Sequence, residues 1–161
     1  YAWGHSQRHR SLYYCIFATM IFFFVNTLKT SYHQARPFWV NSAIQNYGCT
    51  TQFGNPSGHS LTAMGMALSV WLDYNSAIDH DSLKYPWKMS WMRILLLVLA
   101  IIFAMSIGWS RFVLGAHSMN QIIFGLLLGA WLALTYHFLL NEPFLNQMKE
   151  LAEGDYFKKG K

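Results

Sequence analysis

The chain alternates between long stretches without any charged residue and shorter polar segments. No Asp, Glu, Lys or Arg occurs in residues 11–28, 94–110 or 112–141. Each stretch is about as long as a helix that crosses the hydrocarbon core of a bilayer, which takes roughly 20 residues. A fourth apolar stretch, residues 61–72, reaches this length if its helix begins near Ser57. The pattern therefore predicts membrane-spanning helices over residues 12–28, 57–75, 94–109 and 118–140.

The composition agrees with a membrane protein. Of the 161 residues, 53% are hydrophobic and 17% aromatic, while only 12% are charged. This charged fraction is about half of what soluble domains usually carry. We therefore predict an all-α fold, a polytopic membrane helical bundle with four spans in a single domain over residues 1–161. A soluble all-α domain is the alternative, and the length and aromatic content of the uncharged stretches argue against it.

The two ends of the chain are polar. The first residue is Tyr1 rather than Met, and residues 1–11 show no signal-peptide pattern. We therefore expect the natural chain to be longer, with further spans before this one. Residues 141–161 are predicted to form a cytosolic tail, with a short interfacial helix after Pro143.

Positive charges divide unequally between the two sides of this topology. On the side reached after the first span, three are found: Lys29, Arg36 and Arg111. On the side of the N-terminus, the 73–93 loop and the tail, nine are found: Arg8, Arg10, Lys84, Lys88, Arg93, Lys149, Lys158, Lys159 and Lys161. Because Lys and Arg are enriched in cytoplasmic loops, the second side is predicted to be cytosolic and the first lumenal or extracellular. The net charge of +5 is then a topology signal, and we expect no nucleic-acid partner.

The predicted lumenal side has the chemistry of an anion site. All seven acidic residues belong to the cytosolic side or its edge: Asp73, Asp79, Asp81, Glu142, Glu150, Glu153 and Asp155. The lumenal side holds three cations, several histidines and no carboxylate. Since Mg²⁺ and Ca²⁺ need oxygen ligands, we expect this side to bind an oxyanion and to hold no metal.

Three short motifs meet this side. KTSYHQARP (residues 29–37) follows the first predicted span, PSGH (residues 56–59) opens the second, and SRFVLGAHSMNQ (residues 110–121) joins the third to the fourth. An isolated PSGH is typical of a turn that starts a helix. Because all three motifs lie at span ends on one side, we expect them to converge in one pocket.

In order and spacing, the patterns K-x6-R-P, P-S-G-H and S-R-x5-H resemble the three-part signature of the type 2 phosphatidic acid phosphatase superfamily. That family includes lipid phosphate phosphatases, isoprenyl diphosphate phosphatases, glucose-6-phosphatase and the soluble vanadium haloperoxidases. The resemblance runs from Lys29 to Gln121. It implies that the four spans correspond to the last four of a six-helix phosphatase core, and that the reaction uses no metal or other cofactor.

The resemblance also implies roles for single residues. His117 takes the position of the nucleophile, which a neutral imidazole can fill by forming a phosphohistidine. His59 takes that of the general acid, which protonates the leaving oxygen. Lys29, Arg36 and Arg111 take the positions of the phosphate clamp, in which each arginine can bind two oxygens.

Ser57 and Gly58 are expected to complete the phosphate site. A helix start has unpaired N–H groups and a partial positive charge. Gly58 would let this backbone approach the phosphate, and Ser57 would add a hydroxyl.

Gln121 stands where many members of the family have Asp. At four residues from His117 it shares a helix face with it, so its amide oxygen is expected to accept the imidazole N–H and fix the tautomer. The amide brings no negative charge to a developing imidazolium, which predicts a less basic nucleophile.

Other polar residues have simpler interpretations. His33 is expected to be a solvated loop histidine rather than a secondary phosphate contact. The DHD tripeptide at residues 79–81 is expected to lie in a solvated cytosolic loop rather than to bind a metal. Gly125 and Gly129 form a G-x3-G pattern, which we expect to pack helices within the chain rather than to form a dimer.

The loop from Phe38 to Asn55 lies beside the predicted site and is long enough to govern access to it. Within this loop, Cys49, Thr50 and Gln52 are candidates for substrate selection. Cys15, near the start of the first span, lies across the membrane from Cys49, so no disulfide is expected.

We therefore predict a metal-independent membrane phosphatase that hydrolyses a lipid phosphate monoester or diphosphate through a phosphohistidine. The site would face the lumen or the outside, in the endoplasmic reticulum, another endomembrane or the plasma membrane. Its partners would be the bilayer and a phosphorylated lipid or other phosphate ester, and no oligomeric state is predicted. Two alternatives stay open: a glucose-6-phosphatase-like sugar phosphatase, and a non-catalytic membrane subunit that keeps the phosphatase fold.

Overall fold

The computed structural model describes the backbone of residues 2–45, 47, 50–79 and 86–153, and the side chains of residues 11–45, 47, 50–75, 91–140 and 143. The helices in this part of the chain are α1 (Ala2–Tyr32), α2 (Pro37–Val40), α3 (Gly58–Asp79), α4 (Pro86–Val113) and α5 (Met119–Glu153). The described residues include no strand, so the predicted all-α fold is confirmed.

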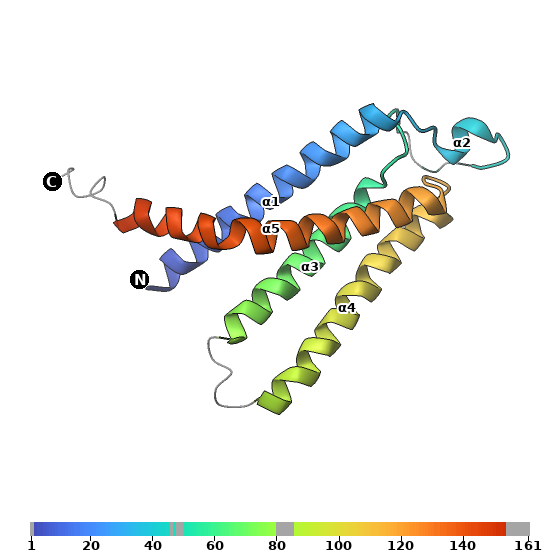
Figure 1. Ribbon diagram of the computed structural model, residues 1–161. Coiled ribbons are helices and arrows are strands. Elements are labelled where there is room, and N and C mark those ends of the chain that lie inside the picture. The colour runs from blue at the N-terminus through green and yellow to red at the C-terminus, as the bar shows by residue number, and fades with distance from the viewer. Residues whose placement is uncertain (1, 46, 48–49, 80–85, 154–161) are drawn as a thin grey trace.

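Four long helices form the bundle, and α3 is its central member (Figure 1). Helix α3 packs against α1, α4 and α5, whereas α1 and α4 lie on either side of it and hardly touch each other. The end of α1, the start of α3, the end of α4 and the start of α5 all lie at the end of the bundle where α2 is found (Figure 1). The topology therefore brings the three sequence motifs to one end of the molecule.

Helix α1 presents an apolar stripe to α3 and α5. The stripe repeats every four positions, which keeps its side chains on one helix face: Tyr13, Phe17, Ile21 and Val25. It packs against four residues of the two other helices: Leu61, Leu132, Ala133 and Tyr136. The next position in the same repeat is Lys29. Packing of the stripe therefore also aims Lys29 toward the start of α3.

Two glycines of α5 allow it to lie close to α3. A Cβ atom on Gly125 would lie 2.7 Å from the carbonyl oxygen of Ser57, and one on Gly129 would collide with the carbonyl of Leu61. The expectation that this pattern packs helices within the chain is confirmed. The close approach brings the first turn of α5 against the start of α3.

Three stretches of the described chain are long and apolar enough to cross a membrane: Ser11–Val40, Trp91–Val113 and Met119–Leu140. They match three of the four predicted spans: 12–28 and 94–109 lie inside them, and 118–140 begins one residue earlier. Helix α3 has 22 residues, and so a length of about 33 Å, but it is not among these stretches.

The polar residues of α3 account for this difference. Ser60 is buried and donates a hydrogen bond to the hydroxyl of Ser57, and Asp73 accepts a hydrogen bond from the hydroxyl of Tyr14 on α1. A helix surrounded by other helices meets little lipid and tolerates polar side chains that have protein partners. The fourth span therefore stays a prediction.

The helices are longer than the predicted spans. Helix α1 begins at Ala2, about three turns before the expected start of the first span. Helix α5 continues through Pro143 to Glu153, so the prediction of a separate short helix after Pro143 was wrong. Proline removes one backbone donor, and the residues that follow it, LNQMKELAE, are mostly strong helix formers that continue the helix.

Candidate active site

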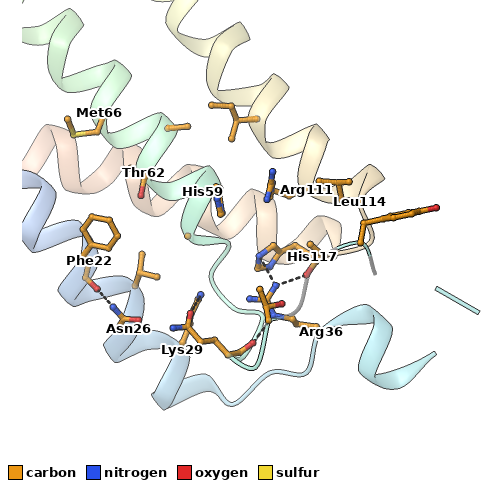
Figure 2. Close-up of a pocket in the computed structure, with 18 of the residues that line it drawn as sticks. Phe22, Asn26, Lys29, Arg36, His59, Thr62, Met66, Arg111, Leu114 and His117 are labelled. Atoms are coloured by element: carbon orange, nitrogen blue, oxygen red, sulfur yellow. Dashed lines mark hydrogen bonds between the residues drawn. The ribbon is translucent and has the colours of Figure 1, made fainter. Parts of the chain in front are cut away.

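The three motifs meet in one cavity of about 800 Å³ at the α2 end of the bundle (Figure 2). Lys29 lies in the last turn of α1 and Arg36 directly before α2, while Arg111 lies in the last turn of α4. Gly58 and His59 begin α3, and His117 precedes α5 by two residues. All six of these predicted site residues line the cavity.

His117 is held in one tautomer by its hydrogen bonds. Its Nδ1 lies 2.9 Å from the carbonyl oxygen of Gly54. Because a carbonyl only accepts, Nδ1 carries the proton. On the other side of the ring, Nε2 lies 3.3 Å from Nη1 of Arg36, which only donates. The lone pair is therefore on Nε2, and this nitrogen faces the clamp.

Burial keeps this imidazole neutral. His117 is only 4% exposed. Burial and, next, the positive charge of Arg36 lower the pKa of His117 from its ordinary 6.5 to about 4, while the hydrogen bonds with Gln121 and Gly54 act in the opposite direction. A neutral ring with its lone pair on Nε2 is the form required of a nucleophile.

This shift predicts a stability effect. Between pH 6.5 and about 4 the unfolded chain binds a proton at His117 and the folded protein does not, so folding stability falls as the pH falls through this window. The loss between pH 7.5 and 4.5 should reach about 2–3 kcal/mol. The measurement is the free energy of unfolding of the native protein and of His117→Gln at each pH, in phosphate-free detergent solution. The difference between the two proteins gives the contribution of His117. If the free energy of unfolding changed with pH in the same way for the two proteins, the neutral, buried state of His117 would be contradicted.

Gln121 fills its predicted role only in part. Its Oε1 lies 3.3 Å from Nδ1 of His117, farther than the Gly54 carbonyl, and also accepts a hydrogen bond from the N–H of Ser118 at 3.2 Å. Its amide nitrogen donates to the carbonyl of Ala35 at 2.9 Å. The fully buried amide thus links the first motif to the third, which an Asp, lacking a donor, would not do.

Gly54 is a site residue that the sequence analysis missed. A Cβ atom at this position would lie 2.5 Å from Nε2 and 2.6 Å from Oε1 of Gln121. Only glycine therefore lets the Gly54 carbonyl reach the imidazole while Gln121 keeps its place. The one signal in the sequence was a glycine two residues before the PSGH motif.

The change Gly54→Ala is therefore expected to displace Gln121 and with it His117. Misplacement of a reacting group by about 1 Å can cost on the order of 100-fold in rate, so kcat should fall about 10- to 100-fold. The measurement is steady-state phosphate release in detergent. In a Gln121→Ala background the colliding amide is gone, so Gly54→Ala should add little further loss. An equal loss in both backgrounds would place the effect elsewhere.

Arg36 is fixed from two sides. Its Nε donates to the carbonyl of Gln52 at 2.7 Å and its Nη1 to the carbonyl of Ala116 at 3.0 Å. Lys29 donates from Nζ to Oε1 of Gln52 at 2.9 Å. Both cations are buried: Arg36 is 3% exposed and Lys29 is 8% exposed. Arg111 is partly exposed, and its Nε lies 3.5 Å from the hydroxyl of Ser110.

The start of α3 presents backbone and a histidine to the cavity. The N–H of Leu61 donates to the carbonyl of Ser57 as the first bond of the helix, so the N–H groups of the preceding turn have no partner within the helix. Gly58 and His59 line the cavity, but Ser57 does not. Its hydroxyl is fully buried and accepts a hydrogen bond from Ser60 at 2.9 Å, so Ser57 lies beneath the site and supports the helix start.

Several other residues were considered in the sequence. His33 is exposed and packs edge-on against Phe53, outside the lining of the cavity. Thr50 and Gln52 line the cavity, whereas Cys49 and the side chains of residues 79–81 lie outside the described residues. Cys15 is a free, exposed cysteine. Among the described side chains, no group of three His, Cys, Asp or Glu residues is placed to hold a metal ion.

The cavity has a cationic end and an apolar arm. The cationic end is formed by Lys29, Arg36 and Arg111, and the described lining of the cavity contains no carboxylate. The arm is lined by side chains of α1, α3 and α4: Phe22, Val25, Ala63, Met66, Phe103 and Ile107. In Figure 2, Phe22 and Met66 lie at the end of the cavity away from Arg36 and His117. Such a space fits an anion that carries an apolar group.

The comparisons with known proteins agree with this geometry. No curated protein and no solved structure matches the chain significantly. The PAP2 superfamily matches residues 10–143, which include all three motifs and every residue of the cationic end. Membership of this superfamily indicates phosphatase activity on phosphate esters, and the apolar helices indicate association with a membrane. The chain thus belongs to the PAP2 superfamily, that of the type 2 phosphatidic acid phosphatases.

Proposed function

We propose that this protein is a metal-independent membrane phosphatase that hydrolyses a lipid phosphate monoester or diphosphate through a phosphohistidine on His117. The observation that carries the proposal is the shape of the cavity, in which a cationic end continues into an apolar arm. The arm lies between α1 and α4, which hardly touch each other. A lipid could place its phosphate among the cations while its chain stays in the arm.

The first step transfers the phosphoryl group to the enzyme. The lone pair on Nε2 of His117 attacks phosphorus, a P–N bond forms, and the bond from phosphorus to the leaving oxygen breaks. His59, in its protonated form, gives its proton to that oxygen. Lys29, Arg36 and Arg111 hold the three remaining oxygens. The positive charge that develops on the imidazole is stabilised through Nδ1–H by the carbonyl of Gly54 and by Oε1 of Gln121.

The second step returns the enzyme to its first state. Water attacks phosphorus from the side that the leaving group has vacated, and His59, now neutral, takes a proton from that water. The P–N bond breaks and its electron pair returns to Nε2 of His117. Inorganic phosphate leaves, and His59 carries the proton with which the cycle began.

The substrate class is tested by phosphate release from the protein in detergent with excess EDTA. We expect turnover of a lipid phosphate or an isoprenyl diphosphate, with much weaker turnover of glucose 6-phosphate, because a sugar leaves the apolar arm unfilled. Preference for glucose 6-phosphate would replace the lipid proposal by the sugar phosphatase. No turnover of any of the three by folded protein that binds vanadate would favour the non-catalytic subunit.

We also propose that the site opens to the lumen or the outside of the cell. The support is the distribution of Lys and Arg, nine on the predicted cytosolic side and three at the site end. Labelling of a single cysteine introduced at exposed Asn41 by a membrane-impermeant reagent, in a Cys15→Ser, Cys49→Ser background, tests this orientation. Labelling in sealed membranes by reagent present on the cytosolic side alone would overturn it.

A further inference from the structure

Gln52 contacts two of the three cations of the clamp although it belongs to none of the three motifs. Its side-chain oxygen accepts from Nζ of Lys29 at 2.9 Å, and its backbone oxygen accepts from Nε of Arg36 at 2.7 Å. Two residues later, the carbonyl of Gly54 accepts from His117. The short segment from Gln52 to Gly54 thus holds the two cations of the first motif and the histidine of the third.

These acceptors are all electrically neutral. Buried Lys and Arg side chains are usually paired with carboxylates. Here the acceptors of Lys29 and Arg36 are an amide oxygen, backbone carbonyls and the neutral imidazole of His117, and the described lining of the cavity has no Asp or Glu. A neutral acceptor orients a cation without cancelling its charge, so the field at the cationic end stays positive when no substrate is bound.

We propose that Gln52 is a positioning residue that aims Lys29 at the phosphoryl group and, being uncharged, leaves the clamp its full positive charge for the substrate. This inference rests on the proposed function of the site. One proton of Nζ is bound to Gln52, and the two others are available to phosphate oxygens. A glutamate at this position would have nearly the same shape and would neutralise Lys29.

The test measures orthovanadate affinity, which does not depend on turnover, in the full chain in detergent. At pH 8, Gln52→Glu should weaken vanadate binding by about tenfold or more. Gln52→Met, which removes the acceptor without adding a charge, should weaken it by only about threefold. Both variants should raise KM for the substrate more than they lower kcat.

A pH series separates a charge effect from a structural one. The introduced carboxyl would face Lys29 of α1, Arg36 before α2, His59 of α3, Arg111 of α4 and His117 before α5. When it is protonated at low pH, it is again a neutral acceptor for Lys29, so the affinity of Gln52→Glu should rise at least to that of Gln52→Met and toward that of the native protein, after correction by the native protein at each pH. A purely structural defect would give a loss that does not change with pH.

Gln45→Glu is the matched control. Gln45 belongs to the same loop, is exposed, and lines a second hollow that shares only His117 with the cavity. The same charge placed there should change vanadate affinity by less than about twofold. An equal loss in Gln45→Glu and Gln52→Glu, or native affinity in Gln52→Glu at pH 8, would overturn the proposal. Failure of the native protein to release phosphate from any substrate, with vanadate affinities as expected, would instead overturn the proposed function alone.

Discussion

Phosphate release is expected to fall by about 10⁴-fold or more when His117 is replaced by alanine, because the proposed covalent intermediate forms on Nε2 of this residue. The imidazole is neutral, its Nδ1–H is bound to Gly54, and its Nε2 lies 3.3 Å from Arg36 at the cationic end. The measurement is single-turnover phosphate release with the substrate that the native protein turns over fastest.

The covalent intermediate is a second readout of the same prediction. Labelled substrate, quenched in alkali, should leave phosphate on the native protein, and His117→Ala should carry none. His33→Asn is the control, since His33 is an exposed histidine between α1 and α2 that does not line the cavity. Retention of the label in His117→Ala would move the nucleophile to another residue.

The second large effect is expected at Arg36, where even the change to lysine should lower kcat/KM by about 100-fold or more. The guanidinium donates at once to the carbonyls of Gln52 and Ala116 and reaches Nε2 of His117. An ammonium group keeps the charge but lacks this planar set of donors. A single lysine therefore cannot hold the loop, the nucleophile and a phosphate oxygen in the same geometry.

Arg111→Lys provides the matched comparison. Arg111 is partly exposed, and the one described hydrogen bond of its side chain is a long one to Ser110. Loss of the planar guanidinium group of Arg111 should lower kcat/KM by only about tenfold, because the lysine can still reach the phosphate from the last turn of α4. Equal losses in the two variants would mean that the contacts of Arg36 with the loop contribute nothing to catalysis.

The sequence was a reliable guide wherever the physical signal was carried by side chains along one segment. Uncharged stretches of about span length gave three apolar helices, because exposure of charge to hydrocarbon is costly. The motifs gave Lys29, Arg36, His59, Arg111 and His117, which the structure brings together in one cavity, because the ends of the helices that carry them lie at one end of the bundle.

The sequence was a poor guide to how these groups are held. Gln121 was expected to be the acceptor of the imidazole N–H, but the carbonyl of Gly54 is closer. A backbone carbonyl belongs to every residue and leaves no mark in the sequence. Ser57 was expected to touch the phosphate, but the helix that starts after it turns its hydroxyl beneath the site.

By itself, then, the sequence determined that this is an all-helical, membrane-type chain with a cationic, histidine-containing end, because hydropathy and side-chain chemistry are local properties. Only the tertiary structure decided which nitrogen of His117 is available, that Gln52 and Gly54 hold Lys29, Arg36 and His117, and that an apolar arm continues from the cationic end. These features depend on contacts between residues as far apart as Gly54 and His117, 63 positions along the chain. Such contacts form only when α5 packs against α3.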